Sequence, residues 1–168
     1  FTLSGSAATN ADTVTDTGSS NTWTCAFDLH NSDANAAVAF TITFDDLAGN
    51  AGTAVTAVSD GTSVTLDDTV PTLTSVSIDS DNAETAATAE TATNGDTVTL
   101  TFVGSETLSS NAAGGKPACA FTLSGTAATN ADTVANPSGN TWTCAFDLAN
   151  ADANAAVAFT ITFDDLAG

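Results

Sequence analysis

The feature that most constrains this chain is a long internal repeat. Phe1–Gly49 returns as Phe121–Gly168, with 40 of the 43 aligned positions identical. The connecting stretch Thr15–Ser20 is one residue shorter in the second copy, so the period is 120 residues before this gap and 119 after it. A period of this length matches one domain per repeat. The chain is therefore expected to contain parts of two copies of one domain.

The same comparison assigns both ends of the chain to positions inside a repeat unit. In a continuing array, the residues after Gly168 would resemble Asn50 onward, and those before Phe1 would resemble the stretch that ends at Lys116–Ala120. We therefore expect a longer tandem protein, or a protomer whose ends are completed by neighbours. The predicted boundaries are 1–68 for the C-terminal part of one repeat, 69–71 for a linker and 72–168 for most of the next repeat, without its final strands.

The charge balance is strongly acidic. Twenty Asp and Glu residues face a single Lys and no Arg, and the formal net charge is −19. Carboxylates without cationic partners must be solvated, capped by backbone N–H groups or neutralised by metal ions. Nucleic acid is not expected as a partner, because phosphate binding depends on Lys and Arg clusters. Adaptation to salty water and specific cation binding remain as two explanations of the acidity.

The apolar content indicates a folded domain. Hydrophobic residues make up 42% of the chain, which is too much for a disordered acidic tail. No apolar run approaches the roughly 18 residues needed to span a bilayer. The apolar content does not indicate a cellular location for the protein, and the cysteines are the residues that do.

The repeat explains the odd number of cysteines. Cys119 and Cys144 belong to one unit, and Cys25 is the copy of Cys144, so the partner of Cys25 is expected two residues before Phe1. We interpret Cys119 and Cys144 as an intradomain disulfide, which implies an oxidising, extracellular or cell-surface setting. Two buried free cysteines are the alternative.

Alternation of apolar and polar residues predicts β-strands, and no segment has a sustained helical period. The last strands of the unit, Thr53–Val58 and Ser63–Leu66, are visible in the first copy alone. Cys119 and Cys144 fall on inward faces, which supports their pairing. Glu84–Asn94 is interpreted as an irregular crossover. The other predicted strands, each with the apolar residues that share one face, are Leu73–Ile78 (Val76, Ile78), Asp96–Val103 (Val98, Leu100, Phe102, pointing inward), Ala118–Leu123 (Cys119, Phe121, Leu123), Thr141–Leu148 (Trp142, Cys144, Phe146, Leu148) and Ala155–Phe163 (Val157, Phe159, Ile161, Phe163).

Short strands separated by Gly, Asn, Asp and Ser turns indicate an all-β antiparallel sandwich. The motifs GDTVTLTF (Gly95–Phe102), FDDLAGNAG (Phe44–Gly52) and SVTLDDTVPTL (Ser63–Leu73) resemble the immunoglobulin-like (Ig-like) repeats of large bacterial surface proteins and adhesins. The resemblance covers essentially the whole period and implies Ig-like sandwiches in tandem. The extra stretch Leu108–Pro117 and the cysteine pair depart from that family.

The side-chain inventory gives little support for catalysis. The chain has no Tyr or Arg, and His30 is replaced by Ala149 in the second copy. No Ser is found beside a base and an orienting acid at a recognisable spacing. We therefore expect no enzyme activity and interpret His30 as an exposed loop residue. Trp23 and Trp142 alternate with apolar residues, which favours core packing over stacking on sugars.

Acidic pairs are the strongest candidates for a binding site. Asp67 and Asp68 lie in the linker region, and Asp164 and Asp165 end a strand of the second unit. In an Ig-like sandwich these positions converge on the domain junction, and carboxylate oxygens suit calcium, the candidate cofactor. The resemblance supports this hypothesis, because repeats of this type often bind calcium between domains. The alternative is turn capping, which also explains a weaker cluster: Asp79, Asp81 and Asn82.

These features favour a structural role. The chain is expected to belong to an extended array of disulfide-bearing Ig-like domains that forms a stalk, fibre or adhesin. Its expected partners are neighbouring copies of the same repeat, joined covalently or head to tail. One alternative is a filament of short protomers joined by strand exchange. Another is a module that binds a glycan or protein ligand.

Overall fold

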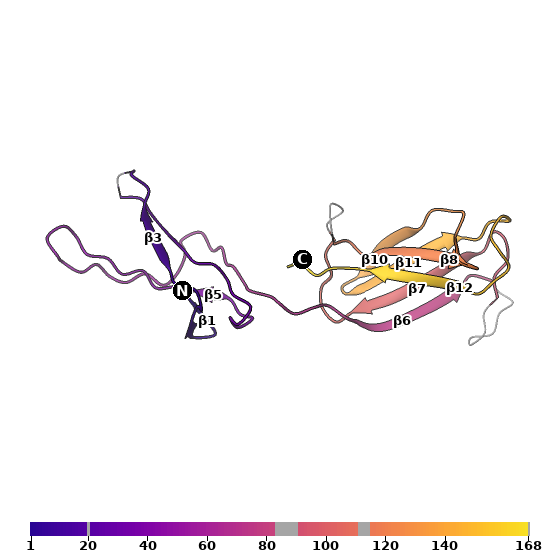
Figure 1. The fold of residues 1–168 in the computed structure, drawn as a ribbon, viewed down its shortest axis with the longest axis horizontal. Coiled ribbons are helices and arrows are strands. Elements are labelled where there is room, and N and C mark those ends of the chain that lie inside the picture. Colours follow the sequence, from indigo (N-terminus) through magenta and orange to yellow (C-terminus); the bar gives the residue numbers. More distant parts are fainter. Residues whose placement is uncertain (20, 83–90, 111–114, 168) are drawn as a thin grey trace. The chain divides into compact units, whose positions relative to one another are not determined.

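The computed structural model describes residues 1–19, 21–82, 91–110 and 115–167. It divides into two compact units, Phe1–Thr69 and Val70–Gly168, with the boundary inside the predicted linker. In the described ranges every regular element is a β-strand and every strand pair is antiparallel (Figure 1), which confirms the predicted all-β antiparallel class. These ranges contain no helix long and apolar enough to cross a membrane. Most of the predicted crossover Glu84–Asn94 and part of Leu108–Pro117 lie outside the described residues.

The second unit contains a four-stranded sheet with the order β10–β11–β7–β6. In its central strands, β7 and β11, buried residues alternate with more exposed ones, because successive side chains point to opposite faces of a sheet. The register pairs Trp142 with Phe102 and Cys144 with Leu100, so the large apolar side chains of both strands share one face. The four strands are β6 (Leu73–Ser80), β7 (Thr97–Gly104), β10 (Thr133–Ser138) and β11 (Thr141–Asp147).

A three-stranded sheet with the order β12–β8–β9 packs against this face. Its strands are β8 (Ala118–Leu123), β9 (Thr126–Ala127) and β12 (Val157–Thr162). Ser124 and Gly125 join β8 to β9, with φ angles of 51° and 78°. Two consecutive residues with positive φ form the tight hairpin turn that matches the twist of the flanking strands.

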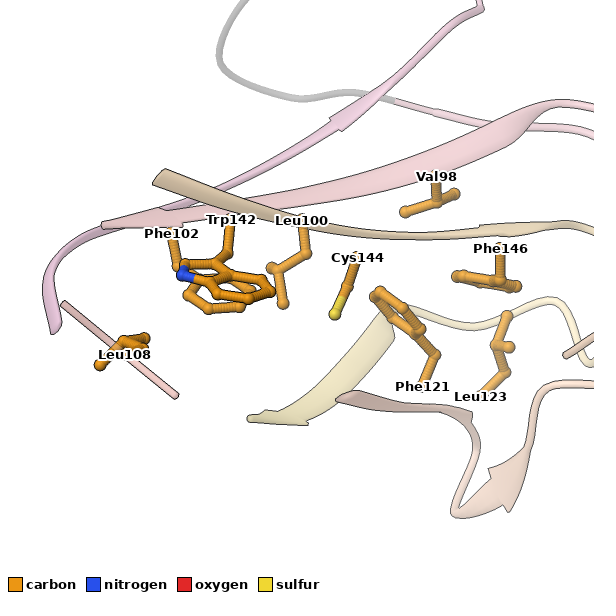
Figure 2. Packing of buried hydrophobic residues seen from close by; sticks show 9 residues of the cluster. All are labelled: Val98, Leu100, Phe102, Leu108, Phe121, Leu123, Trp142, Cys144 and Phe146. Carbon is orange, nitrogen blue, oxygen red and sulfur yellow. The ribbon is translucent and has the colours of Figure 1, made fainter. Parts of the chain in front are cut away.

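The core lies between the two sheets of the second unit. Figure 2 shows side chains of β7 and β11 pointing toward Phe121 and Leu123 of β8, and the ring centroids of Phe121 and Phe146 lie 4.5 Å apart. Two antiparallel sheets that share one core make this unit sandwich-like. The buried cluster consists of Val98, Leu100, Phe102, Leu108, Phe121, Leu123, Trp142, Cys144 and Phe146.

Three residues on the predicted apolar faces of their strands are substantially exposed. Val76 and Ile78 of β6 are each 43% exposed, and Phe159 of β12 is 41% exposed. Both strands are edges of their sheets, so a side chain there has a neighbouring strand on one side alone. Alternation therefore predicts burial well in central strands and overestimates it at the edges.

The first unit has shorter strands and little core. Leu3 and Leu66 are its buried hydrophobic residues within the described ranges. The predicted strands Thr53–Val58 and Ser63–Leu66 are reduced to the isolated bridges Ile42–Val55 and Ala37–Thr65, because little apolar contact supports longer pairing. Its sheets are β2–β1–β5, formed by Ser6–Ala7, Thr2–Leu3 and Val38–Ala39, and the hairpin β3–β4, formed by Thr13–Asp16 and Trp23–Ala26.

Equivalent segments of the two units form the same local structure. The ring centroids of Phe1 and Phe27 lie 4.4 Å apart, and those of their copies Phe121 and Phe146 lie 4.5 Å apart, with interplanar angles of 26° and 33°. The repeated sequence therefore specifies strand pairing and aromatic contacts in the same way in both units. The shared register pairs Val14–Cys25, Thr2–Ala7 and Thr2–Ala39 in the first unit as it pairs Val134–Cys144, Thr122–Ala127 and Thr122–Ala158 in the second.

Candidate functional site

A disulfide connects the two sheets of the second unit. Cys119 of β8 and Cys144 of β11 are bonded, with their Cα atoms 6.3 Å apart and a sequence separation of 25 residues. Cys144 is fully buried, and the bond sits in the core beside the cluster of Figure 2. Cys25, the copy of Cys144, is an exposed free thiol. The disulfide thus forms where the repeat contains both cysteines.

A carboxylate fastens two loops of the second unit together. Oδ1 of Asp152 accepts hydrogen bonds from the N–H and the hydroxyl of Thr129 at 2.9 and 2.7 Å. Oδ2 accepts one from the N–H of Ala149 at 2.9 Å. We call this set of hydrogen bonds the loop clamp. The hydrogen bond from the Ala149 N–H is the largest cause, and the one from the Thr129 hydroxyl the second largest, of a pKa of Asp152 below its usual 3.8.

The first unit contains the same loop clamp. Asp33 accepts hydrogen bonds from the N–H and hydroxyl of Thr9 at 2.8 and 2.6 Å and from the N–H of His30 at 2.9 Å. The Thr9 hydroxyl is the largest cause of the lowered pKa of Asp33, ahead of the His30 N–H. Neither clamp was predicted from the sequence. Thr9 and Asp33 do not stand out there, because 40 of the 43 aligned positions of the repeat are identical in the two copies.

His30 lies on the surface, as predicted for a loop residue. Its Nδ1 is 2.9 Å from the hydroxyl of Ser32. Ala149 and Ala151 replace these two residues in the second unit, where the loop clamp is unchanged. The His30–Ser32 contact is therefore not required for the loop to fold.

Asp67 and Asp68, two of the predicted calcium ligands, end the first unit. The N–H of Thr69 donates to Oδ1 of Asp67 at 3.0 Å, which is a turn-capping contact. The N–H of Asp68 donates to Oδ1 of Asn35 at 3.1 Å. Asp67 therefore caps a turn immediately before the second unit begins.

The other two predicted ligands, Asp164 and Asp165, follow β12 and have different environments. Asp164 is exposed, whereas Asp165 is 7% exposed. The backbone here pairs with the extra stretch of the repeat, since Asp165 bridges to Leu108 and the N–H of Ser109 donates to the carbonyl of Asp164 at 2.8 Å. Adjacent residues of an extended segment face opposite ways, which explains the difference in burial.

Glu106 is the acidic residue that lies close to Asp165. One carboxylate oxygen of Glu106 is within 4.8 Å of one from Asp165. The N–H of Ala167 also donates to Oδ1 of Asp165 at 2.8 Å. Glu106 was not predicted as a site residue. Its carboxylate lies near Asp165 because Leu108 and Asp165 form a long-range bridge, which the sequence does not reveal.

Asp46, the copy of Asp165, caps a turn in the first unit. Its carboxylate accepts hydrogen bonds from the N–H of Ala48 at 2.9 Å and from the N–H and side-chain amide of Asn50, both at 2.8 Å. The Asn50 side chain is the main cause of the lowered pKa of Asp46. The aspartate at this position of the repeat therefore caps a turn in the first unit.

The weaker acidic cluster also caps backbone groups. Oδ1 of Asp79 accepts from the N–H of Ser80 at 3.0 Å, and Oδ1 of Asp81 accepts from the N–H of Thr97 at 2.8 Å. Asn82 donates its N–H to the hydroxyl of Ser80 at 3.3 Å. The contacts of Asp79 and Asn82 are local, whereas the Asp81–Thr97 bond joins residues 16 apart in sequence and so is not a turn cap.

The two tryptophans have opposite environments. Trp142 is 3% exposed in the core of the second unit, as predicted. Trp23, its copy, is 64% exposed, so the prediction of core packing is wrong for Trp23, because no second sheet covers its strand in the described part of the first unit.

Comparison with protein-family models, with curated proteins and with solved structures found no match to this chain. Its function therefore has to be inferred from the contacts described above.

Proposed function

We propose that this chain is a structural part of an extended array of Ig-like domains, carried outside the cell as a stalk, fibre or adhesin. The observation that supports this most strongly is the reproduction of one local structure in both units. The repeated sequence gives the same strand registers, the same aromatic pair and the same loop clamp. Such interchangeable units suit a spacer, whose neighbours are further copies of the same repeat.

The disulfide supports both the location and the mechanical role. Disulfides persist in oxidising compartments outside the cytoplasm. The Cys119–Cys144 bond joins β8 of one sheet to β11 of the other, so the sheets cannot separate fully while it is intact. When the array is pulled, the segment between the two bonded cysteines therefore cannot extend.

The location is tested by labelling intact cells that produce the protein. A membrane-impermeant amine reagent should modify Lys116, and an added protease should cleave the protein, without lysis of the cells. A cytoplasmic protein in the same cells is the control for leakage. Labelling that appears only after lysis would contradict the proposal.

We also propose a divalent-cation site, with calcium as the preferred ion, at the end of the second unit where the chain enters it. The buried carboxylate of Asp165 and that of Glu106 lie within 4.8 Å, and like charges at this distance favour a cation. Hydrogen bonds between Thr72 and Ser105, at 2.8 and 3.0 Å, hold the entering chain next to Glu106.

The cation site predicts that calcium stabilises the second unit. Calcium should raise the melting temperature and magnesium should raise it less, because calcium accepts irregular oxygen ligation. Glu106→Gln should remove the calcium effect, whereas Asp164→Asn, which makes the same charge change at an exposed position, should keep it. An identical melting temperature in calcium and in chelator would leave turn capping as the role of Asp165.

A further inference from the structure

In a surface loop of the first unit, one backbone N–H donates to a side chain that can take its proton. The N–H of Ser32 donates to Nδ1 of His30 at 3.2 Å, and the hydroxyl of Ser32 lies 2.9 Å from the same nitrogen. Nδ1 can accept this N–H in the neutral ring whose proton is on Nε2. Imidazole gains and loses a proton near neutral pH. His30 is therefore a base within hydrogen-bond distance of a peptide nitrogen.

This peptide nitrogen follows an asparagine, Asn31, whose side-chain amide is a reaction partner for it. Attack of the Ser32 nitrogen on Cγ of Asn31 closes a succinimide ring, which is the first step of asparagine deamidation. A peptide nitrogen is a poor nucleophile, because its lone pair is delocalised into the carbonyl group. Asn31 and Ser32 are the exposed central residues of a turn, closed at 2.8 Å by the N–H of Asp33 and the carbonyl of His30. Water therefore has access to the reacting groups.

The copy of this turn in the second unit lacks the base. The same turn forms there, closed by a bond of 3.0 Å between the N–H of Asp152 and the carbonyl of residue 149, and the loop clamp holds it. Asn150 is thus in an equivalent turn without an imidazole, and it serves as a reference inside the same chain. Segments 28–40 and 147–159 differ at two positions, which are His30 and Ser32 in the first copy and Ala149 and Ala151 in the second.

Another asparagine, Asn94, precedes a glycine, which offers the least steric hindrance to the same attack. The N–H of Gly95 donates to the carbonyl of Leu148 at 2.9 Å. A carbonyl oxygen accepts this hydrogen bond but is too weak a base to remove the proton. The bond therefore holds the Gly95 nitrogen in its turn without activating it. The structure thus ranks Asn31 above Asn94, whereas the following residue alone would rank them in the opposite order.

We propose that Asn31 is a site of spontaneous deamidation, with His30 as the base that accelerates it. Nδ1 of His30 takes the proton of the Ser32 nitrogen as this nitrogen bonds to Cγ of Asn31. The imidazolium returns the proton to the amide nitrogen, which leaves as ammonia, and water then opens the succinimide to aspartate or isoaspartate. The carboxylate of Asp33 interacts electrostatically with the ring and attracts the imidazolium.

The reaction alters one of the two loop clamps. Isoaspartate at position 31 carries the backbone through its side-chain carbon, so the chain between His30 and Asp33 becomes longer. The turn that brings the His30 N–H to the Asp33 carboxylate is then lost. The clamp of the first unit should therefore loosen as the protein ages, whereas the clamp of the second unit stays intact.

The test incubates the 168-residue chain at neutral pH and follows each asparagine by chymotryptic digestion and mass spectrometry. The peptides that end at Phe40 and Phe159 report Asn31 and Asn150 separately, and electron-transfer fragmentation distinguishes aspartate from isoaspartate. Asn31 should convert faster than Asn150 by about tenfold or more, since a positioned base commonly contributes at least this factor. His30→Ala should remove most of the difference. This variant should fold, because the second unit forms the same turn with Ala149.

Denaturant distinguishes the folded contact from a simple sequence effect. In the folded chain His30→Ala should slow the conversion of Asn31 by about tenfold, and in denaturant by less than about twofold, because the contact with the Ser32 nitrogen depends on the turn. Equal rates for wild type and His30→Ala in the folded chain would overturn the proposal. An effect of His30→Ala that is the same in folded and denatured chain would also overturn it.

A transplant into the second unit gives an independent decision. Ala149→His combined with Ala151→Ser should accelerate Asn150 by about tenfold over Ala151→Ser alone, which controls for the side chain that follows the asparagine. No acceleration in the double variant would overturn the proposal. Asn94 is the internal standard for general conditions, since neither substitution touches the Gly95–Leu148 bond. The readout is the conversion of a single residue, so it is independent of cellular location and of force.

Discussion

At the scale of the residue, one side chain type has two environments in this chain. Trp142 packs in the core at 3% exposure, and its copy Trp23 is 64% exposed. The flanking sequence is the same, and so is the strand register. Burial of this residue is therefore decided by β7 and β8, and not by its own segment.

This contrast predicts a large difference between two equivalent substitutions. Trp142→Ala should lower the free energy of unfolding of the second unit by about 3–5 kcal/mol, because it removes a large buried aromatic side chain. Trp23→Ala should change the free energy by less than about 0.5 kcal/mol, as is usual for exposed positions. Denaturant unfolding followed by circular dichroism measures both. Equal effects of the two substitutions would contradict the assignment of the core.

The loop clamp predicts a pH dependence. The pKa of Asp152 is lowered in the folded state, so its contribution to stability is present above about pH 3.8 and is lost as the pH falls through the lowered pKa. Asp152→Asn should therefore lower the melting temperature at pH 7 and have much less effect near pH 2. Asp164→Asn is the control with the same charge change at an exposed site. A difference between wild type and Asp152→Asn that does not shrink in acid would exclude the clamp as its cause.

At the scale of the element, the disulfide is the covalent link between two sheets that otherwise meet through side chains. Cys119 and Cys144 enclose a loop of 25 residues, and closing such a loop in the unfolded chain stabilises the folded state by roughly 3 kcal/mol. The two bonded strands belong to different sheets, so the link acts across the core.

Replacing Cys119 and Cys144 together by Ala should lower the free energy of unfolding of the second unit by about 2–4 kcal/mol. Cys25→Ala is the matched control, since Cys25 forms no disulfide, and should have little effect. Chemical denaturation in the absence of reductant measures the change. Equal stability of the double variant and wild type would show that the disulfide is not structural.

The sequence predicts central strands better than edge strands, for physical reasons. β7, β8 and β11 alternate clearly, because both neighbours and the opposite sheet select their apolar residues. β10 was missed, since Pro137 and a lack of alternation argue against a strand. Pro137 is tolerated in β10 because β10 is an edge strand whose register is irregular between Ala135 and Ser138. The Glu106–Asp165 approach depends on a single long-range bridge, which no local pattern reveals.

At the scale of the whole molecule, the chain combines a strongly acidic surface with units built from one repeated sequence. The net charge of −19 opposes non-specific association between copies. Specific association must then rely on directed contacts, such as strand pairing, a disulfide or a shared cation. Each of these would connect a unit to its neighbour in an array.

The central claim is that the second unit is a force-bearing domain with an internal covalent stop, and single-molecule pulling on the 168-residue chain tests it most directly. The chain held by its two ends should show a discrete unfolding event of the second unit. Reduction should lengthen the chain released in that event by about 85 Å, which is the extended length that corresponds to the sequence separation of 25 residues from Cys119 to Cys144. Smooth extension without a discrete event, or the same released length before and after reduction, would contradict the claim.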